Sequence, residues 1–192
     1  ESLSLLYREL ADYCEAKYSL LTQHTDPEKA LPPLLVRQQK AVDLITQCYQ
    51  QMHMLSAQNN TDYKRMLRIF QEALDLQEHI SVSLHQPEEV QKLVERSHAE
   101  EVIRWNAQTV ATRLRVLADD ILYHRLPTRF TMEKQIGALE KIARQHPDNP
   151  VGQFCYWHFS RIARVLRTQK PLYARDLLAD KQRRMPLLPA LK

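Results

Sequence analysis

Glycine is nearly absent from this sequence. Only Gly137 and Gly152 occur among its 192 residues. Tight hairpins and phosphate-binding loops need positions with positive φ, which glycine supplies. So few glycines exclude a Rossmann GxGxxG motif and a Walker P-loop, and they argue against a sheet of several antiparallel strands.

Cysteine and long apolar runs are also scarce. Cys14, Cys48 and Cys155 are odd in number and far apart, so we expect no disulfide framework and a reducing compartment, the cytoplasm. The longest apolar run, residues 31–36, contains two prolines, whereas a membrane-spanning helix needs about twenty residues. There is no signal peptide pattern. Because the chain begins at Glu1 in sequence that already has a helical pattern, we expect a fragment of a longer protein.

Helix-forming residues and unevenly placed charges are what the sequence does contain. Leu, Gln, Glu, Arg and Ala dominate, and a hydrophobic content of 44% is too high for a disordered chain. The net charge is +4. Residues 1–30 hold three basic and six acidic side chains, whereas residues 160–192 hold nine basic and two acidic ones. The basic character therefore belongs to the C-terminal end.

Apolar residues recur at three- and four-residue spacing along most of the chain, which is typical of amphipathic helices. In the second helix the predicted buried stripe is Leu35, Val42, Ile45, Tyr49, Met52 and Leu55. Lys170-Pro171 is expected to end the seventh helix. We predict an all-α antiparallel bundle of about seven or eight helices with short loops. The predicted helices are 2–23, 32–57, 61–80, 88–96, 100–124, 131–145, 151–168 and a short basic segment ending near residue 184.

Several polar groups suggest chemistry, and each also has a structural interpretation. Glu95 and His98 form one Glu-x-x-His motif, whereas a di-iron bundle needs two. Asp119-Asp120 lies one turn from His124, which suits an acid–base pair but is more often a surface ion pair near a helix end. His158 lies on an apolar stripe, where a hydrogen-bonded core histidine is the favoured interpretation. We therefore predict no enzyme activity, no metal and no cofactor.

Two groups of residues are candidate binding sites. Trp157, Arg161 and Arg164 fall along one side of their helix, where a cation–π pair and a second guanidinium would suit an anionic aromatic ligand. The alternative is a polar face whose arginine stems lie along the surface. The basic C-terminal stretch matches no nucleic-acid docking motif. It fits a segment beside a membrane, whose candidate headgroup contacts are Arg175, Lys181, Arg183 and Arg184.

Three stretches resemble one family. Residues 5–13, Leu-Leu-Tyr-Arg-Glu-Leu-Ala-Asp-Tyr, resemble the helix that leaves the first membrane bundle in FUSC-like (fusaric acid resistance-like) bacterial inner-membrane proteins. Residues 70–80 are similar to a helix in the soluble domain of the same proteins, in the YccS/YhfK group. Residues 117–122 and Pro127 fit that domain too. These are helix-surface and core patterns without chemistry of their own, so the resemblance depends on their order over nearly the whole chain.

The resemblance implies a placement that the residues alone do not. The chain would be a single domain, residues 1–192, between two membrane bundles of a longer parent, on the cytoplasmic face of the inner membrane. The parent would be an exporter of aromatic carboxylic acids, and the domain would act in assembly, gating or partner binding. Its partners would be the membrane bundles of its own chain, anionic lipid headgroups and a second copy in a homodimer, with no nucleic acid. The alternative is a free-standing helical module that binds an anionic aromatic molecule.

Overall fold

The computed structural model describes the backbone of residues 1–22, 27–56, 61–82 and 87–184. It describes the side chains of residues 1–20, 28–29, 31–56, 63–82 and 88–167. This part of the chain forms seven α-helices and no strand, which confirms the predicted all-α bundle. The helices are α1 (Ser2–Thr22), α2 (Pro27–Ser56), α3 (Thr61–Ser81), α4 (Pro87–Arg96), α5 (Ala99–Leu122), α6 (Glu133–Gln145) and α7 (Pro150–Arg184).

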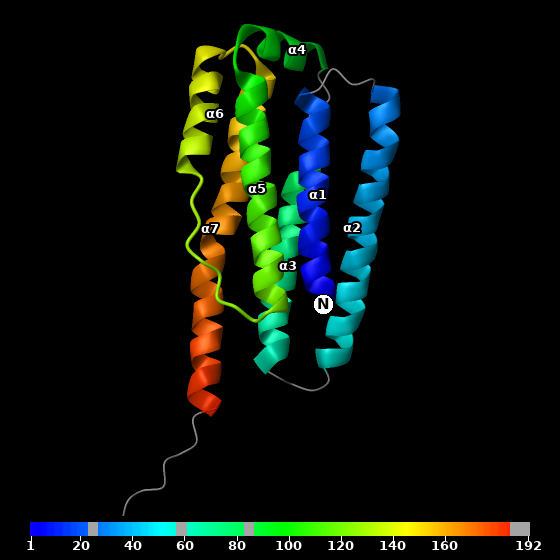
Figure 1. Cartoon of the computed structure of the whole chain (residues 1–192), viewed down its shortest axis with the longest axis vertical. Coiled ribbons are helices and arrows are strands. Elements are labelled where there is room, and N and C mark those ends of the chain that lie inside the picture. Colours follow the sequence, from blue (N-terminus) through cyan, green and yellow to red (C-terminus); the bar gives the residue numbers. More distant parts are fainter. Residues whose placement is uncertain (23–26, 57–60, 83–86, 185–192) are drawn as a thin grey trace, which may run out of the picture.

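The long helices alternate in direction along one axis of the molecule (Figure 1). α1 rises, α2 descends and α3 rises again; α4 crosses the upper end; then α5 descends, α6 rises and α7 descends. As a result, α1 begins and α7 ends toward the same, lower end of the bundle. None of the described helices is both long enough and apolar enough to cross a bilayer.

α1 is the central helix. It packs against α2, α3, α4 and α5, and its contact with α5 is the most extensive in the described bundle. The apolar spacing of α5 predicts a buried stripe from Ile103 to Ile121, and it is buried as far as Leu117, whereas Ile121 is half-buried. α1 also has buried apolar residues that recur every three or four positions. The buried apolar residues at this spacing are Leu3, Leu6, Leu10 and Cys14 of α1 and Ile103, Ala107, Val110, Leu114 and Leu117 of α5.

Polar side chains fix the two connections on either side of α6. Asn149 caps α7, because its Oδ1 accepts hydrogen bonds from the backbone N–H groups of Val151 (3.0 Å) and Gly152 (3.4 Å). Pro150 follows as the first helical residue, where a missing N–H costs nothing. Before α6, buried Arg113 donates to the carbonyl oxygen of Thr128 at 2.8 Å. This bond secures the connection 123–132, which is longer than the predicted loop.

The structure corrects two predicted helix boundaries, both at prolines. α2 begins at Pro27, with Pro32 and Pro33 inside the helix instead of at its start. α7 continues through Pro171 to Arg184, so the predicted break and the separate eighth helix are wrong. A proline removes one helical hydrogen bond and leaves a carbonyl four residues earlier unpaired. Arg167, four residues before Pro171, is exposed, so water can reach that turn of α7.

The predicted buried stripe of α2 is also wrong for three of its residues. Leu35, Val42 and Tyr49 are exposed, whereas Met52 is buried. The inner face consists instead of Ala41, Leu44, Cys48 and Met52. α2 has apolar side chains over more than half of its circumference, so spacing alone could not identify the side that meets α1.

Candidate functional site

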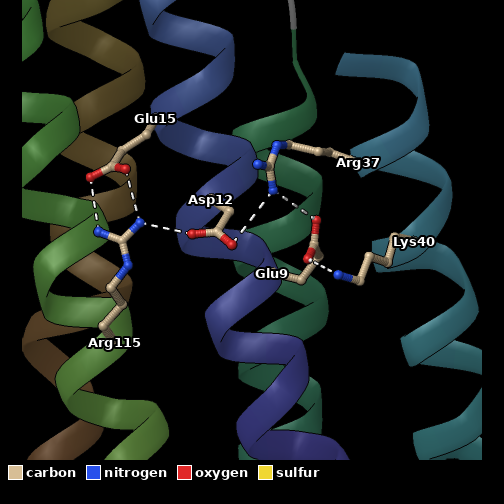
Figure 2. Close-up of polar contacts among 6 residues, drawn as sticks. All are labelled: Glu9, Asp12, Glu15, Arg37, Lys40 and Arg115. Atoms are coloured by element: carbon tan, nitrogen blue, oxygen red, sulfur yellow. Dashed lines mark hydrogen bonds and ion pairs between the residues drawn. The ribbon is translucent and has the colours of Figure 1, made fainter. Parts of the chain in front are cut away.

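Three carboxylates lie along one side of α1, between α2 and α5 (Figure 2). Glu9, Asp12 and Glu15 are spaced by three residues, which places them on adjacent turns of the helix. Arg37 and Lys40 extend toward them from α2, and Arg115 extends from α5. We call these six residues the α1 charge network.

The α5 side of the α1 charge network has the closer geometry. Arg115 makes a two-pronged contact with Glu15, with Nη1–Oε1 and Nη2–Oε2 distances of 2.9 Å. Its Nη2 also donates to Asp12 Oδ1 at 2.8 Å. Paired hydrogen bonds of this kind are the strong form of an ion pair. The hydrogen bonds that Arg115 donates to Glu15 and then to Asp12 raise the pKa of Arg115, so it stays charged.

The α2 side is looser, but one of its carboxylates is deeply buried. Lys40 Nζ lies 3.2 Å from Glu9 Oε2, and Arg37 Nη1 lies 3.6 Å from Glu9 Oε1 and 3.5 Å from Asp12 Oδ2. The Glu9 side chain is only 4% exposed. Removing its partners would leave a charge in a site of low dielectric, which is costly. Three anions and three cations therefore hold α2 and α5 to opposite sides of α1. These ion pairs fix the positions of the helices.

The predicted ligand group is divided between two places. The Arg161 guanidinium lies 4.4 Å from the ring centroid of Trp157, so the cation–π pair is present on the exposed side of α7. Arg164 is separate. It lines a groove of about 310 Å³ between α6 and α7, together with Arg167, Ser160 and Glu140. Trp157 and Arg161 do not line that groove, so the three residues do not converge on one volume.

Comparison with known proteins places the chain in a family. The family model described as FUSC-like inner membrane protein yccS matches residues 1–177. The chain belongs to the FUSC-like family. No solved structure matches this FUSC-like chain. The family match agrees with the resemblance found in the sequence, and its description is that of an inner membrane protein.

The predicted headgroup contacts of this FUSC-like chain lie outside the described side chains. Arg175, Lys181, Arg183 and Arg184 belong to the last part of α7, for which only the backbone is described, and the apolar tail 185–192 lies beyond the described residues. The contacts of these four basic residues stay a prediction. The described backbone places the stretch at the lower end of the bundle, where α1 begins (Figure 1).

The predicted acid–base pair is not assembled. Asp119 pairs with Arg8 of α1, and Asp120 Oδ1 lies 3.3 Å from Arg125 Nε. His124, just after α5, has its Nδ1 3.2 Å from Arg65 of α3. Each carboxylate thus meets an arginine instead of the imidazole. The ion-pair interpretation of the two aspartates therefore describes their contacts better than acid–base chemistry does.

His158 is buried, as predicted, but in apolar surroundings. It is 1% exposed, its ring stacks on Phe154 at 5.1 Å, and its Nε2 has no hydrogen-bond partner in the described part of the chain. Burial, followed by the nearby charges of Lys17 and His79, lowers the pKa of His158 to about 3. The ring is therefore a neutral part of the core, as the core interpretation predicts, and its Nε2 lacks a hydrogen bond among the described residues. Among the described residues, no group of three or more His, Cys, Asp or Glu side chains is arranged to hold a metal ion.

Sequence reasoning missed the α1 charge network and a buried lysine. Lys17 is 5% exposed and donates to the carbonyl oxygens of Ile80 and Val82 at the end of α3. A cation suits the C-terminal end of a helix. The acid spacing of three on an otherwise apolar first helix was the one signal in the sequence for the network. Nothing in the sequence indicated which cations, 25 to 103 residues away from the acids that they meet, would complete the network.

Proposed function

We propose that this chain is the cytoplasmic domain of a FUSC-like inner-membrane transport protein of the efflux type. It would link two membrane bundles and act in assembly or gating. Within the family we place it closest to the YhfK branch, on the residue patterns quoted above. One observation carries the proposal: α1 begins and α7 ends at the same end of the bundle (Figure 1). Segments joined to both ends would reach a single membrane surface.

The central position of α1 supports a coupling role. α1 is the first helix, and it packs on four others. Through Asp12 it is joined both to α2 and to α5 by ion pairs. A shift of α1 caused by a segment before it would therefore be passed to both neighbours, because close-packed helices move as units.

Labelling of the full-length protein in membranes tests the placement. Cys14, Cys48 and Cys155 are buried and should stay unlabelled while the domain is folded. Exposed Lys64 provides a reporter as Lys64→Cys. A membrane-impermeant maleimide should label it in inverted vesicles and not in intact spheroplasts. Labelling from the outside would refute the cytoplasmic placement.

Export of aromatic carboxylates tests the coupling. Arg115→Ala removes the pairs of α5 with Asp12 and Glu15 of α1, whereas the control Arg104→Ala removes only a pair within α5, to Glu100 at 2.6 Å. If α1 couples the domain to transport, the first variant should slow export at unchanged protein level, and the second should leave it unchanged. Equal export by both variants and the wild type would contradict the coupling role.

The headgroup contact is a separate part of the proposal. The end of α7 lies at the end of the bundle where α1 begins, which is the end that we assign to the membrane. Vesicles containing phosphatidylglycerol should bind the chain more strongly than neutral phosphatidylcholine vesicles do. Charge reversal of Arg183 and Arg184 to Glu should remove this preference. Equal binding to both kinds of vesicle would overturn the contact.

The free-standing ligand module has less support. The guanidinium of Arg161 already covers Trp157, and Arg164 lines a different groove. An aromatic acid would have to displace Arg161 from the indole before it could stack there. The observations therefore favour the membrane-linked domain.

A further inference from the structure

α2 is the least covered long helix of the described bundle. It packs only on α1 and α3, and it stands at one side of the molecule (Figure 1). Its outer side has a line of large apolar residues that no described part of the chain covers. Leu31 is 46% exposed, Leu35 is 53% exposed, Val42 is 40% exposed and Tyr49 is 62% exposed. We call these four residues the α2 seam.

The spacing of the α2 seam is that of a helix–helix contact. Its members follow one another at intervals of four, seven and seven residues, and half-buried Gln38 and Ile45 occupy the intervening positions. Repeats averaging 3.5 residues keep one stripe facing a partner helix over several turns. Exposed apolar residues scattered singly on a surface show no such order. The seam therefore matches a second helix lying along α2.

The charges of α2 leave the seam free for a second copy of the same surface. Arg37 and Lys40 lie on the inner side, where they pair with Glu9 and Asp12 of α1 (Figure 2). The exposed residues that flank the seam on its outer edge are uncharged Gln39, Thr46 and Gln50, and next to them Asp43, whose carboxylate accepts a hydrogen bond from Gln39 at 3.0 Å. Two identical surfaces brought together by a two-fold axis place like charges opposite each other, so an uncharged stripe is well suited to self-association.

We propose that the α2 seam is the contact between two copies of this chain, with their α2 helices side by side and parallel. The parallel direction rests on the proposed function. If both ends of each bundle face one membrane, two copies share that orientation, and a two-fold axis along the membrane normal makes their α2 helices parallel. Leu35, Val42 and Tyr49 then each meet the same residue of the other copy, as core positions of a parallel two-stranded coiled coil do.

The size of the seam predicts a weak contact in solution. From Leu31 to Tyr49 it extends about 27 Å, at about 1.5 Å per residue. With a helix width of about 10 Å, it covers roughly 300 Å² on each copy, below the roughly 800 Å² per partner of a stable complex. Two domains held on the same membrane would meet at a much higher effective concentration. The seam thus suits a tethered pair.

Disulfide trapping of single-cysteine additions tests the contact and its direction. The variants are Leu35→Cys, Val42→Cys and Tyr49→Cys, and the native cysteines are buried. Gln47→Cys is the matched control, because Gln47 is exposed on the same helix but faces away from the seam. Under mild oxidation at high protein concentration, each seam variant should form a self-linked dimer much faster than the control does.

The outcomes separate the contact from its direction. An antiparallel pair centred on Val42 would trap Val42→Cys with itself but Leu35→Cys only with Tyr49→Cys, which would overturn the parallel arrangement. Equal, slow trapping of all four variants would overturn the contact itself. Neither result depends on the maleimide labelling, so failure here is distinguishable from failure of the membrane placement.

A charge placed in the seam gives a second readout. Val42→Lys should abolish the concentration dependence of the sedimentation coefficient, whereas Gln47→Lys should leave it as in the wild type. Circular dichroism of both variants checks that the bundle stays helical. A wild-type chain that sediments as a monomer up to millimolar concentration would also refute the contact.

Discussion

Replacing His158 with Phe should make the chain more resistant to acid. The His158 ring is almost fully buried among aromatic rings, and burial lowers its pKa to about 3 from an ordinary value of 6.5. Between pH 6.5 and 3 the unfolded chain therefore binds a proton that the folded chain does not bind. By linkage, the wild type loses stability as pH falls through this range, and the stability is fully present above pH 6.5.

The magnitude follows from the size of the pKa shift. Each pH unit below 6.5 costs the wild type about 1.4 kcal/mol relative to His158→Phe, so the difference grows by roughly 3 kcal/mol between pH 6.5 and 4.5. At neutral pH the difference is small. Removal of the unpaired Nε2 stabilises the variant by about 1–3 kcal/mol, and the larger ring opposes this by a similar amount.

Urea unfolding at several pH values measures this difference. Circular dichroism reports helix loss for the wild type and for His158→Phe, and the contributions of the carboxylates cancel when the two free energies of unfolding are subtracted. His53→Phe is the matched control, because His53 is exposed and its ring is hydrated in both states. If the wild type and His158→Phe differ by the same amount at pH 7 and pH 4.5, the assigned environment of His158 is wrong.

Three further substitutions test other parts of the bundle. Gly137→Ala should raise the free energy of unfolding by about 0.5–1 kcal/mol in thermal melts, because a Cβ there meets no atom within 4 Å and the helix loses a flexible residue. Arg115→Ala should lower the free energy of unfolding by about 1 kcal/mol in urea titrations, since Arg115 is partly exposed. A double-mutant cycle of Arg115→Ala with Glu15→Ala should show a coupling free energy, whereas a cycle of Arg104→Ala with Glu15→Ala should show none. For Lys17, burial lowers the pKa to about 8, so from pH 8 to 10.5 the unfolded chain binds the extra proton. The wild type should therefore gain roughly 3 kcal/mol over Lys17→Met in this range, and no gain would contradict burial of the charge.

The helices could be predicted where one apolar face is narrow. Outside the stripe from Ile103 to Leu117, α5 is mostly polar apart from exposed Trp105 and Val116, so the spacing identifies the buried face. α2 lacks that contrast. Leu35 and Val42 are as apolar as Leu44, and the choice between their faces depends on Glu9 and Asp12, which attract Arg37 and rotate the helix. Which face of α2 is buried therefore depends on contacts with residues far away in the sequence, and the spacing of apolar residues contains no information on those contacts.

The candidate site was harder to predict than the fold. The pairing of Trp157 with Arg161 follows from spacing within one helix, and the structure contains it. The α1 charge network joins residues from three helices, and its partners are fixed only once the helices have packed. The proline boundaries failed for a different reason. Proline weakens a helix by a finite free energy, and the backbone of α7 continues as a helix past Pro171.

The α1 charge network and the α2 seam lie on opposite sides of α2, and the rotation of α2 about its own axis determines both. The pairs of Arg37 and Lys40 with α1 turn the cations of α2 inward, and this same rotation turns Leu35, Val42 and Tyr49 outward. A helix with its charges on the outer side would repel an identical copy. Asp12 binds both Arg37 and Arg115, so the position of α5 constrains the seam through α1. These ion pairs are mostly half-exposed and contribute little net stability. They have a positional role here, because they determine which face of α2 is available to a partner.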